Sequence, residues 1–237
     1  DTALVLRTYR RKDVKFIKQL EKDAELLKEI LVSVLCEKHP KNPSEIKDYQ
    51  YDACSTFLSN FDHIFTLNYD LLLYWVIIND LYGNKKIKNV KDGFRYSELN
   101  EDYVTWHPED AKEQSIYFLH GALHLFDSGP EINKFTWIKT GISLMEQIRE
   151  SLQKDWYPLF VSEGTSEEKM TKINHSQYLG KGIRSFASIT GNLFIYGHSL
   201  AENDMHYLNL IAKSRIQNLF ISIYGDINDN KNKYIIK

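Results

Sequence analysis

Four short polar segments carry the residues of this sequence that are best suited to chemistry. They are Asn68-Tyr69-Asp70, His120-Gly121, Ser162-Glu163-Gly164 and Gly197-His198-Ser199. A histidine is suited to proton transfer because its pKa lies near neutral pH. Amides, carboxylates and hydroxyls can orient a polar ligand, and a glycine lets the backbone approach that ligand closely. The set predicts a ligand site in which His120 is the candidate base.

Each of these segments directly follows a short apolar run that is typical of a buried strand. The runs cover 63–67, 115–119, 159–161 and 192–196, and a fifth lies at 218–223. Helical patterns lie between the runs, and a longer one at 12–36 precedes them. Strands that alternate with helices predict an α/β fold, a doubly wound, Rossmann-like parallel sheet. Ligands of such sheets bind beyond the carboxyl ends of the strands, where these segments lie.

We expect a single domain over residues 1–237 with two insertions. The first insertion, 83–113, is polar and irregular. The second, 121–140, has the pattern of a small β-hairpin around Asp127-Ser128-Gly129-Pro130. Neither segment contains a linker that would divide the chain.

Composition excludes several classes of protein. The formal net charge is −2, so no nucleic acid is expected as a partner. No apolar run reaches the roughly 18 residues of a membrane helix, and the start of the chain lacks a signal-peptide pattern. The only cysteines are Cys36 and Cys54, too few for a disulfide framework or a four-cysteine zinc site. These features predict a cytoplasmic protein that binds no membrane.

Taken in order, the four segments resemble the sirtuin-like superfamily, and most specifically an uncharacterised bacterial sirtuin-like family. Thr66-Leu67-Asn68-Tyr69-Asp70 resembles the Thr-x-Asn-x-Asp segment of that superfamily, and His120-Gly121 resembles its His-Gly pair. The stretch 157–163 is similar to a third motif, and Gly197-His198-Ser199 with Leu200 is similar to the Gly-Thr-Ser-Leu turn. The resemblance spans roughly residues 60–225, and the order of the motifs constrains it more than any single motif does.

The resemblance implies that the chain binds NAD and cleaves the nicotinamide–ribose bond, as bacterial anti-phage proteins of this kind do. It implies catalytic roles for His120, as the base on a ribose hydroxyl, and for Asn68 and Asp70, which would orient the ribose or the attacking water. It also implies a dinucleotide-binding set: Thr66, Asn68, Tyr69, Gly121, Gly197, His198, Ser199 and Asp204. NAD or an ADP-ribose-type molecule is the expected partner, and no metal is expected.

Two departures from the superfamily matter. The first glycine of the sequence is Gly83, so the glycine-rich loop that receives the pyrophosphate would lie before residue 1. Protein-deacetylating sirtuins carry a four-cysteine zinc module, which two cysteines cannot supply. The second departure argues against a peptide deacylase.

Structural explanations stand beside the functional ones. Asn68 and Asp70 also suit a strand-to-helix turn and helix cap, and His120 also suits a core position. The spacing of His120, His124 and Asp127 would hold zinc on a helix, but the flanking residues are strand-like. A module that only senses a dinucleotide or ADP-ribose, an interaction protein that has lost the site, and a homo-oligomer all stay open.

Overall fold

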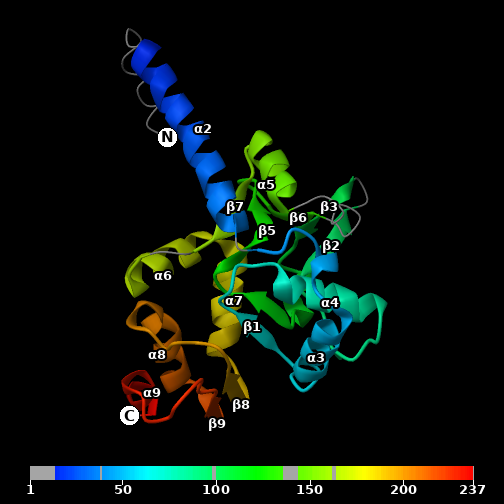
Figure 1. Ribbon diagram of the computed structural model, residues 1–237, viewed down its shortest axis with the longest axis vertical. Helices are drawn as coiled ribbons and strands as arrows, with labels where there is room; N and C mark the ends of the chain where they lie inside the picture. The colour runs from blue at the N-terminus through cyan, green and yellow to red at the C-terminus, as the bar shows by residue number, and fades with distance from the viewer. Residues whose placement is uncertain (1–13, 38, 98–99, 136–143, 162–163, 237) are drawn as a thin grey trace.

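The computed structural model describes residues 14–37, 39–97, 100–135, 144–161 and 164–236. It is a mixed α/β structure with both parallel and antiparallel strand pairs (Figure 1). Three α-helices flank the first strand in the sequence: α2 (Val14–Glu37) and α3 (Asp48–Leu58) come before it, and α4 (Leu72–Tyr82) follows it. Over the described residues, α2 confirms the helix that the sequence predicts at 12–36, and α4 confirms a helix between the first two apolar runs.

Strands β1 (Ile64–Thr66) and β4 (Ile116–Phe118) form a parallel pair, in register from Ile64 opposite Ile116. Both strands were expected from their apolar runs, and the direction of the pair is also the expected one. Beyond the pair, the Leu119 N–H donates to the Thr66 carbonyl at 2.8 Å, and the Leu123 N–H donates to the Tyr69 carbonyl at 2.8 Å. The chain after β1 therefore runs alongside the chain after β4.

The largest sheet is antiparallel and has the strand order β2-β3-β6-β5-β7. Its strands are β2 (Phe94–Ser97), β3 (Asn100–Trp106), β5 (Gly121–Asp127), β6 (Ile132–Phe135) and β7 (Tyr157–Phe160). The β5–β6 hairpin was predicted, although the end of its second arm lies outside the described residues. The two segments expected as insertions pair with each other through β3 and β6.

The strand at 157–160 corrects one expectation. It was predicted to join the parallel sheet, but β7 pairs antiparallel with β5, with Gly121 opposite Phe160. The place of β7 at the edge of the sheet explains why this strand can contain Pro158. Because β7 is an edge strand of the sheet, a residue without an N–H need not break the ladder.

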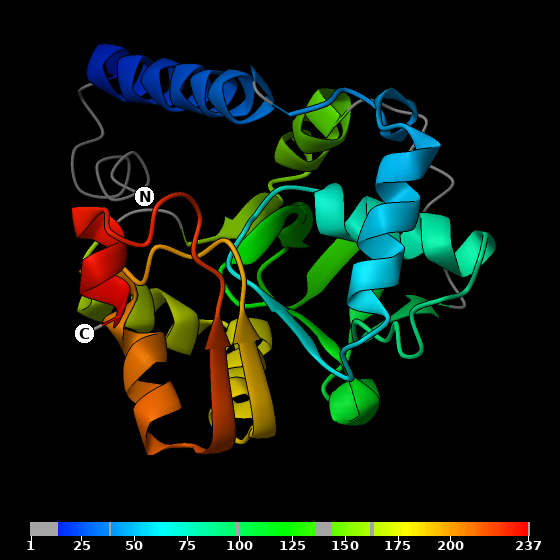
Figure 2. The same ribbon diagram turned by 60° about the horizontal axis from the view of Figure 1, so that its bottom comes forward.

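Strands β8 (Thr190–Ile195) and β9 (Arg215–Ile221) form the second parallel pair. A parallel pair needs a crossover, and here η4 (Glu202–Asp204) and α8 (Met205–Lys213) supply it. Figure 2 shows the two strands side by side, with α8 next to them. Helices α6 (Ser166–His175) and α7 (Gln177–Ala187) lead into β8, as the sequence predicts.

The described chain also contains the helices η1 (Pro43–Glu45), η2 (Asp110–Glu113) and α5 (Leu144–Gln153). Helix α2 projects from the body (blue in Figure 1), and Leu27 on it is 66% exposed. A short helix, α9 (Asn230–Ile236), ends the described chain. None of the helices in the described ranges is long and apolar enough to cross a membrane.

Candidate functional site

His120 lies at the junction between the parallel pair β1–β4 and the antiparallel sheet. Its side chain is only 5% exposed, and its carbonyl accepts a hydrogen bond of 2.8 Å from the Val161 N–H. Gly121 turns the chain there with a φ of +75°, and a Cβ on it would lie 1.9 Å from the Leu159 carbonyl oxygen. Only glycine fits both the backbone angle and that contact. The sharp turn therefore fixes where the His120 imidazole sits.

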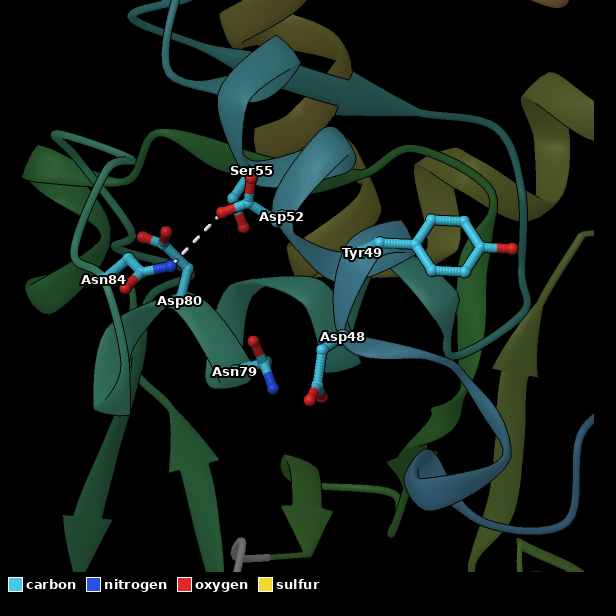
Figure 3. Close-up of a pocket in the computed structure, with 7 residues that line it drawn as sticks. All are labelled: Asp48, Tyr49, Asp52, Ser55, Asn79, Asp80 and Asn84. Carbon is cyan, nitrogen blue, oxygen red and sulfur yellow. Dashed lines mark hydrogen bonds between the residues drawn. The ribbon is translucent and has the colours of Figure 1, made fainter.

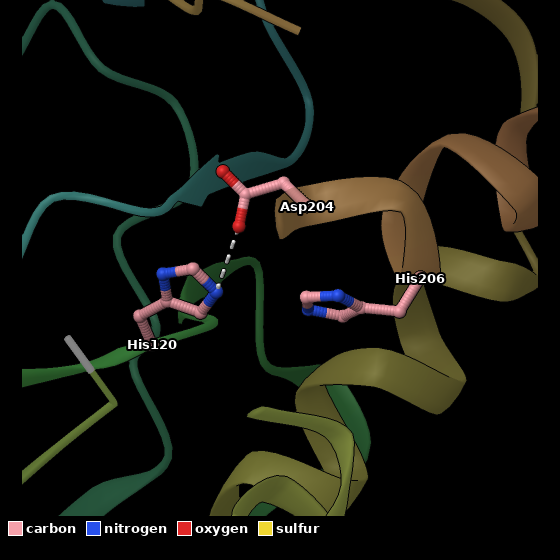
Figure 4. Close-up of side chains that lie close together, drawn as sticks. All are labelled: His120, Asp204 and His206. Carbon is pink, nitrogen blue, oxygen red and sulfur yellow. Dashed lines mark ion pairs between the residues drawn. The ribbon is translucent and has the colours of Figure 1, made fainter. Parts of the chain in front are cut away.

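The start of helix α8 covers the His120 side chain. His120 Nε2 lies 3.8 Å from Asp204 Oδ1, and the ring centroids of His120 and His206 are 6.0 Å apart (Figure 4). The Tyr207 hydroxyl donates a hydrogen bond of 3.0 Å to the Leu119 carbonyl. That bond holds the helix against the end of β4, so Asp204 and His206 face His120.

The Asp204 carboxylate makes polar contacts with several side chains of this cluster. Lys169 Nζ lies 2.9 Å from its Oδ1, and His198 Nε2 lies 3.2 Å from its Oδ2. Burial pushes the pKa of Asp204 upward, but the hydrogen bond and charge of Lys169 outweigh burial and leave that pKa below its usual value. The carboxylate is therefore ionised and held by a buried ammonium group.

The pKa of His120 shows how its environment acts on the imidazole. Burial lowers that pKa to about 4, although the negative charge of Asp204 opposes the shift. The positive charge of Lys169 adds to the lowering. The His120 imidazole is therefore uncharged at neutral pH, and its contact with Asp204 is polar rather than ionic.

The loop after β8 brings His198 into the cluster. Gly197 has a φ of +68°, and its N–H donates to Ser222 Oγ at 3.1 Å. His198 Nδ1 accepts from the Leu200 N–H at 2.9 Å, so the neutral ring carries its proton on Nε2, toward Asp204. Ser199 is exposed. The segments after β4 and β8 were predicted to share one site. They do come together, because His120 and His198 both lie near Asp204.

The segment after β1 is joined by backbone hydrogen bonds to the chain on both sides of His120, at Leu119 and Leu123. Asn68 and Tyr69 are exposed, and the Asn68 N–H donates to Thr66 Oγ1 at 3.1 Å. Asp70 Oδ1 accepts from the Leu72 N–H at 2.8 Å, which makes an Asx turn that leads into α4, whose N-cap position is Leu71. The Asp70 contact matches the strand-to-helix turn that the sequence left open as an alternative. Ser162 and Glu163 lie outside the described residues.

Sequence reasoning missed three members of the cluster, namely Lys169, His206 and Ser166. Ser166 Oγ lies 3.0 Å from His206 Nδ1, and it accepts a hydrogen bond of 2.9 Å from the His206 N–H. One signal was available: Lys169 is four residues before Ile173, on the apolar face of a predicted helix. His124, by contrast, is enclosed between Tyr74 and Phe118 and does not join His120.

A pocket of about 410 Å³ lies elsewhere, between α3 and α4 (Figure 3). Its lining is acidic and includes Asp48, Asp52 and Asp80. Two of those carboxylates are engaged in local structure: Asp52 binds Lys86, and Asp80 accepts from the Lys86 and Ile87 N–H groups. We therefore assign this pocket no function.

Comparison with known proteins identifies a family but no activity. No curated protein and no solved structure matches the chain. The family described as Domain of unknown function (DUF4917) matches residues 1–237, the whole chain. The chain therefore belongs to the DUF4917 family.

Proposed function

We propose that this chain binds NAD and hydrolyses its nicotinamide–ribose bond, with His120 as the base. The observation that carries the proposal is the convergence of His120, His198 and Asp204, three residues that the sirtuin-like resemblance assigns to one site. The doubly wound, Rossmann-like arrangement of the resemblance belongs to the same proposal. The parallel pairs β1–β4 and β8–β9 are consistent with it.

The residues present suit a dinucleotide in two respects. His120 Nε2 is buried and has no hydrogen-bond partner in the described part of the chain, so a neutral ring with its proton on Nδ1 would offer the Nε2 lone pair to a substrate proton. Gly197 is exposed, and a Cβ on it would meet nothing within 4 Å, which leaves room for a ligand against the backbone. Asn68, Thr66 and Tyr69 would contact the ribose side, and Ser199 would donate to a phosphate or ribose oxygen.

In the proposed reaction, water adds to the ribose carbon as the bond to nicotinamide breaks. His120 accepts a proton from a ribose hydroxyl, and Asp204 stabilises the imidazolium that forms. The products are nicotinamide, ADP-ribose and one proton released to solvent. By the same resemblance, we place the activity in the cytoplasm, in the depletion of NAD during anti-phage defence.

The test measures nicotinamide release from NAD by the purified chain, in the presence of EDTA. We expect release by the unchanged protein and a loss of roughly 100-fold or more in His120→Ala, the size of a general-base contribution. His107→Ala is the matched control, because His107 is exposed. Equal rates for His120→Ala and the unchanged protein would remove His120 as the base. Tight NAD binding without release would instead favour the sensing module.

A further inference from the structure

Two buried imidazole nitrogens face the same space beside Asp204. In the described residues, His120 Nε2 and His206 Nε2 are buried and make no hydrogen bond. The candidate ligand atoms of His120, Asp204 and His206 all lie within 4.8 Å of one another (Figure 4). Unpartnered buried polar atoms are costly, so a pair aimed at one carboxylate calls for a ligand that satisfies both.

The groups behind these three side chains hold them in place. Ser166 Oγ lies 3.0 Å from His206 Nδ1, which leaves Nε2 as the free nitrogen of that ring. Lys169 and His198 contact the two oxygens of Asp204 at 2.9 and 3.2 Å. Outer contacts of this kind orient histidine and carboxylate ligands in metal sites.

We propose that His120, Asp204 and His206 form a binding site for a divalent transition-metal ion, with Zn²⁺ the best match. Two imidazoles and one carboxylate are ligands that zinc takes in proteins, and they leave a fourth position open. Zinc ligands about 2.0–2.1 Å from the ion lie roughly 3.4 Å from one another. Small rotations of the two rings would close the observed spacing.

The Lys169 ammonium group lowers the affinity of this site for a metal ion. Its ammonium neutralises Asp204 and repels a cation, so the ion is exchangeable rather than structural. A carboxylate has about four lone-pair positions, so the contacts to Lys169 and His198 leave Asp204 able to bind an ion as well. Loss of Lys169 would therefore strengthen binding.

Zinc and the proposed hydrolysis compete for the same atom. A metal ion on His120 Nε2 occupies the lone pair that must accept the proton, so the ion-bound protein is inactive. This consequence rests on the proposed function, whereas the binding site itself does not. The two claims can therefore fail separately.

The binding test titrates the metal-free chain with Zn²⁺ in a calorimeter, and Co²⁺ absorption in the visible gives a second readout. We expect one ion per chain, and affinity at least tenfold weaker in His206→Gln. Ser166→Ala keeps all three ligands and removes only the contact behind His206, so it perturbs the fold less; we expect it to weaken binding about tenfold. His107→Gln, at an exposed histidine, should bind like the unchanged protein.

No binding to the unchanged protein would overturn the site, as would unchanged affinity in both His206→Gln and Ser166→Ala. Nicotinamide release is then compared with Zn²⁺ and with EDTA. Inhibition that is weaker in His206→Gln supports the competition. Zinc binding without any release, under either condition, would reject the proposed hydrolysis and leave the metal site standing. Release that Zn²⁺ does not reduce would reject the competition.

Discussion

At the scale of single residues, Gly121 has the least space for a Cβ of the glycines in the described part of the chain. Gly121→Ala would place a side chain at a φ of +75° and a Cβ 1.9 Å from the Leu159 carbonyl oxygen. The left-handed backbone angle alone costs about 1–2 kcal/mol in an alanine, and overpacking adds about 1–3 kcal/mol. We expect the free energy of unfolding, measured with urea, to fall by the sum of both effects.

Gly191→Ala separates the two effects. Gly191 has a φ of +79°, but a Cβ there would meet nothing within 4 Å. This variant should lose only the cost of the backbone angle. If the two variants are equally destabilised, then contact with the Leu159 carbonyl does not constrain residue 121.

At the scale of elements, the N-terminus of α6 supports the cluster because Ser166 and Lys169 lie in its first turn. Thr165 caps this helix: its Oγ1 accepts from the Glu168 N–H at 3.3 Å, and Glu168 Oε2 accepts from the Thr165 N–H at 2.8 Å. Thr165→Ala should lower the free energy of unfolding by about 1 kcal/mol, because it removes a capping acceptor.

The matched control for the cap is Thr171→Ala in the interior of the same helix. Thr171 is exposed, and its hydroxyl donates back to the Glu167 carbonyl, a bond within the helix that caps nothing, and alanine has the higher helix propensity. Urea denaturation should therefore show little change or a slight gain for Thr171→Ala. A loss equal to that of Thr165→Ala would mean that the cap is not the cause.

Local sequence patterns predicted the elements better than their partners. The 3.6-residue period located α2 and α4, and short apolar runs located β1, β4 and β8, because those signals lie within each element. The partner of the strand at 157–160 was missed, because an apolar run does not encode the direction of its neighbour. Helix α9 was missed because its sequence is too polar for a periodic signal.

The candidate site shows the same limit at the scale of the whole molecule. Residues that follow strands were predicted to meet, and His120, His198 and Asp204 do lie together. Lys169 and His206 join them only because α6 and α8 pack side by side. Packing of that kind depends on contacts between residues 35 to 40 positions apart, which no local motif in this sequence predicts.

The stability of the whole molecule should depend on pH through His124. This side chain is buried, stacked on the Tyr74 ring at 4.5 Å and against Phe118 at 5.0 Å, and neither ring nitrogen has a hydrogen-bond partner among the described residues. Burial lowers its pKa well below 6.5, and the nearby charges of Lys134 and His39 lower it further. The folded protein therefore keeps His124 neutral in mild acid.

The unfolded chain binds a proton at His124 once the pH falls below about 6.5, whereas the folded chain does not. Unfolding then takes up a proton, so stability is complete above this pH and falls below it by about 1.4 kcal/mol per pH unit. The decline continues until the pH reaches the lowered pKa of the folded state.

His124→Leu removes the titrating group. In this variant the free energy of unfolding should therefore fall by about 1.4 kcal/mol less per pH unit over this range. The free energy of unfolding of both proteins, measured with urea between pH 7.5 and about 5, checks the prediction. Parallel curves would show that other groups, such as the buried His120, account for the whole acid dependence.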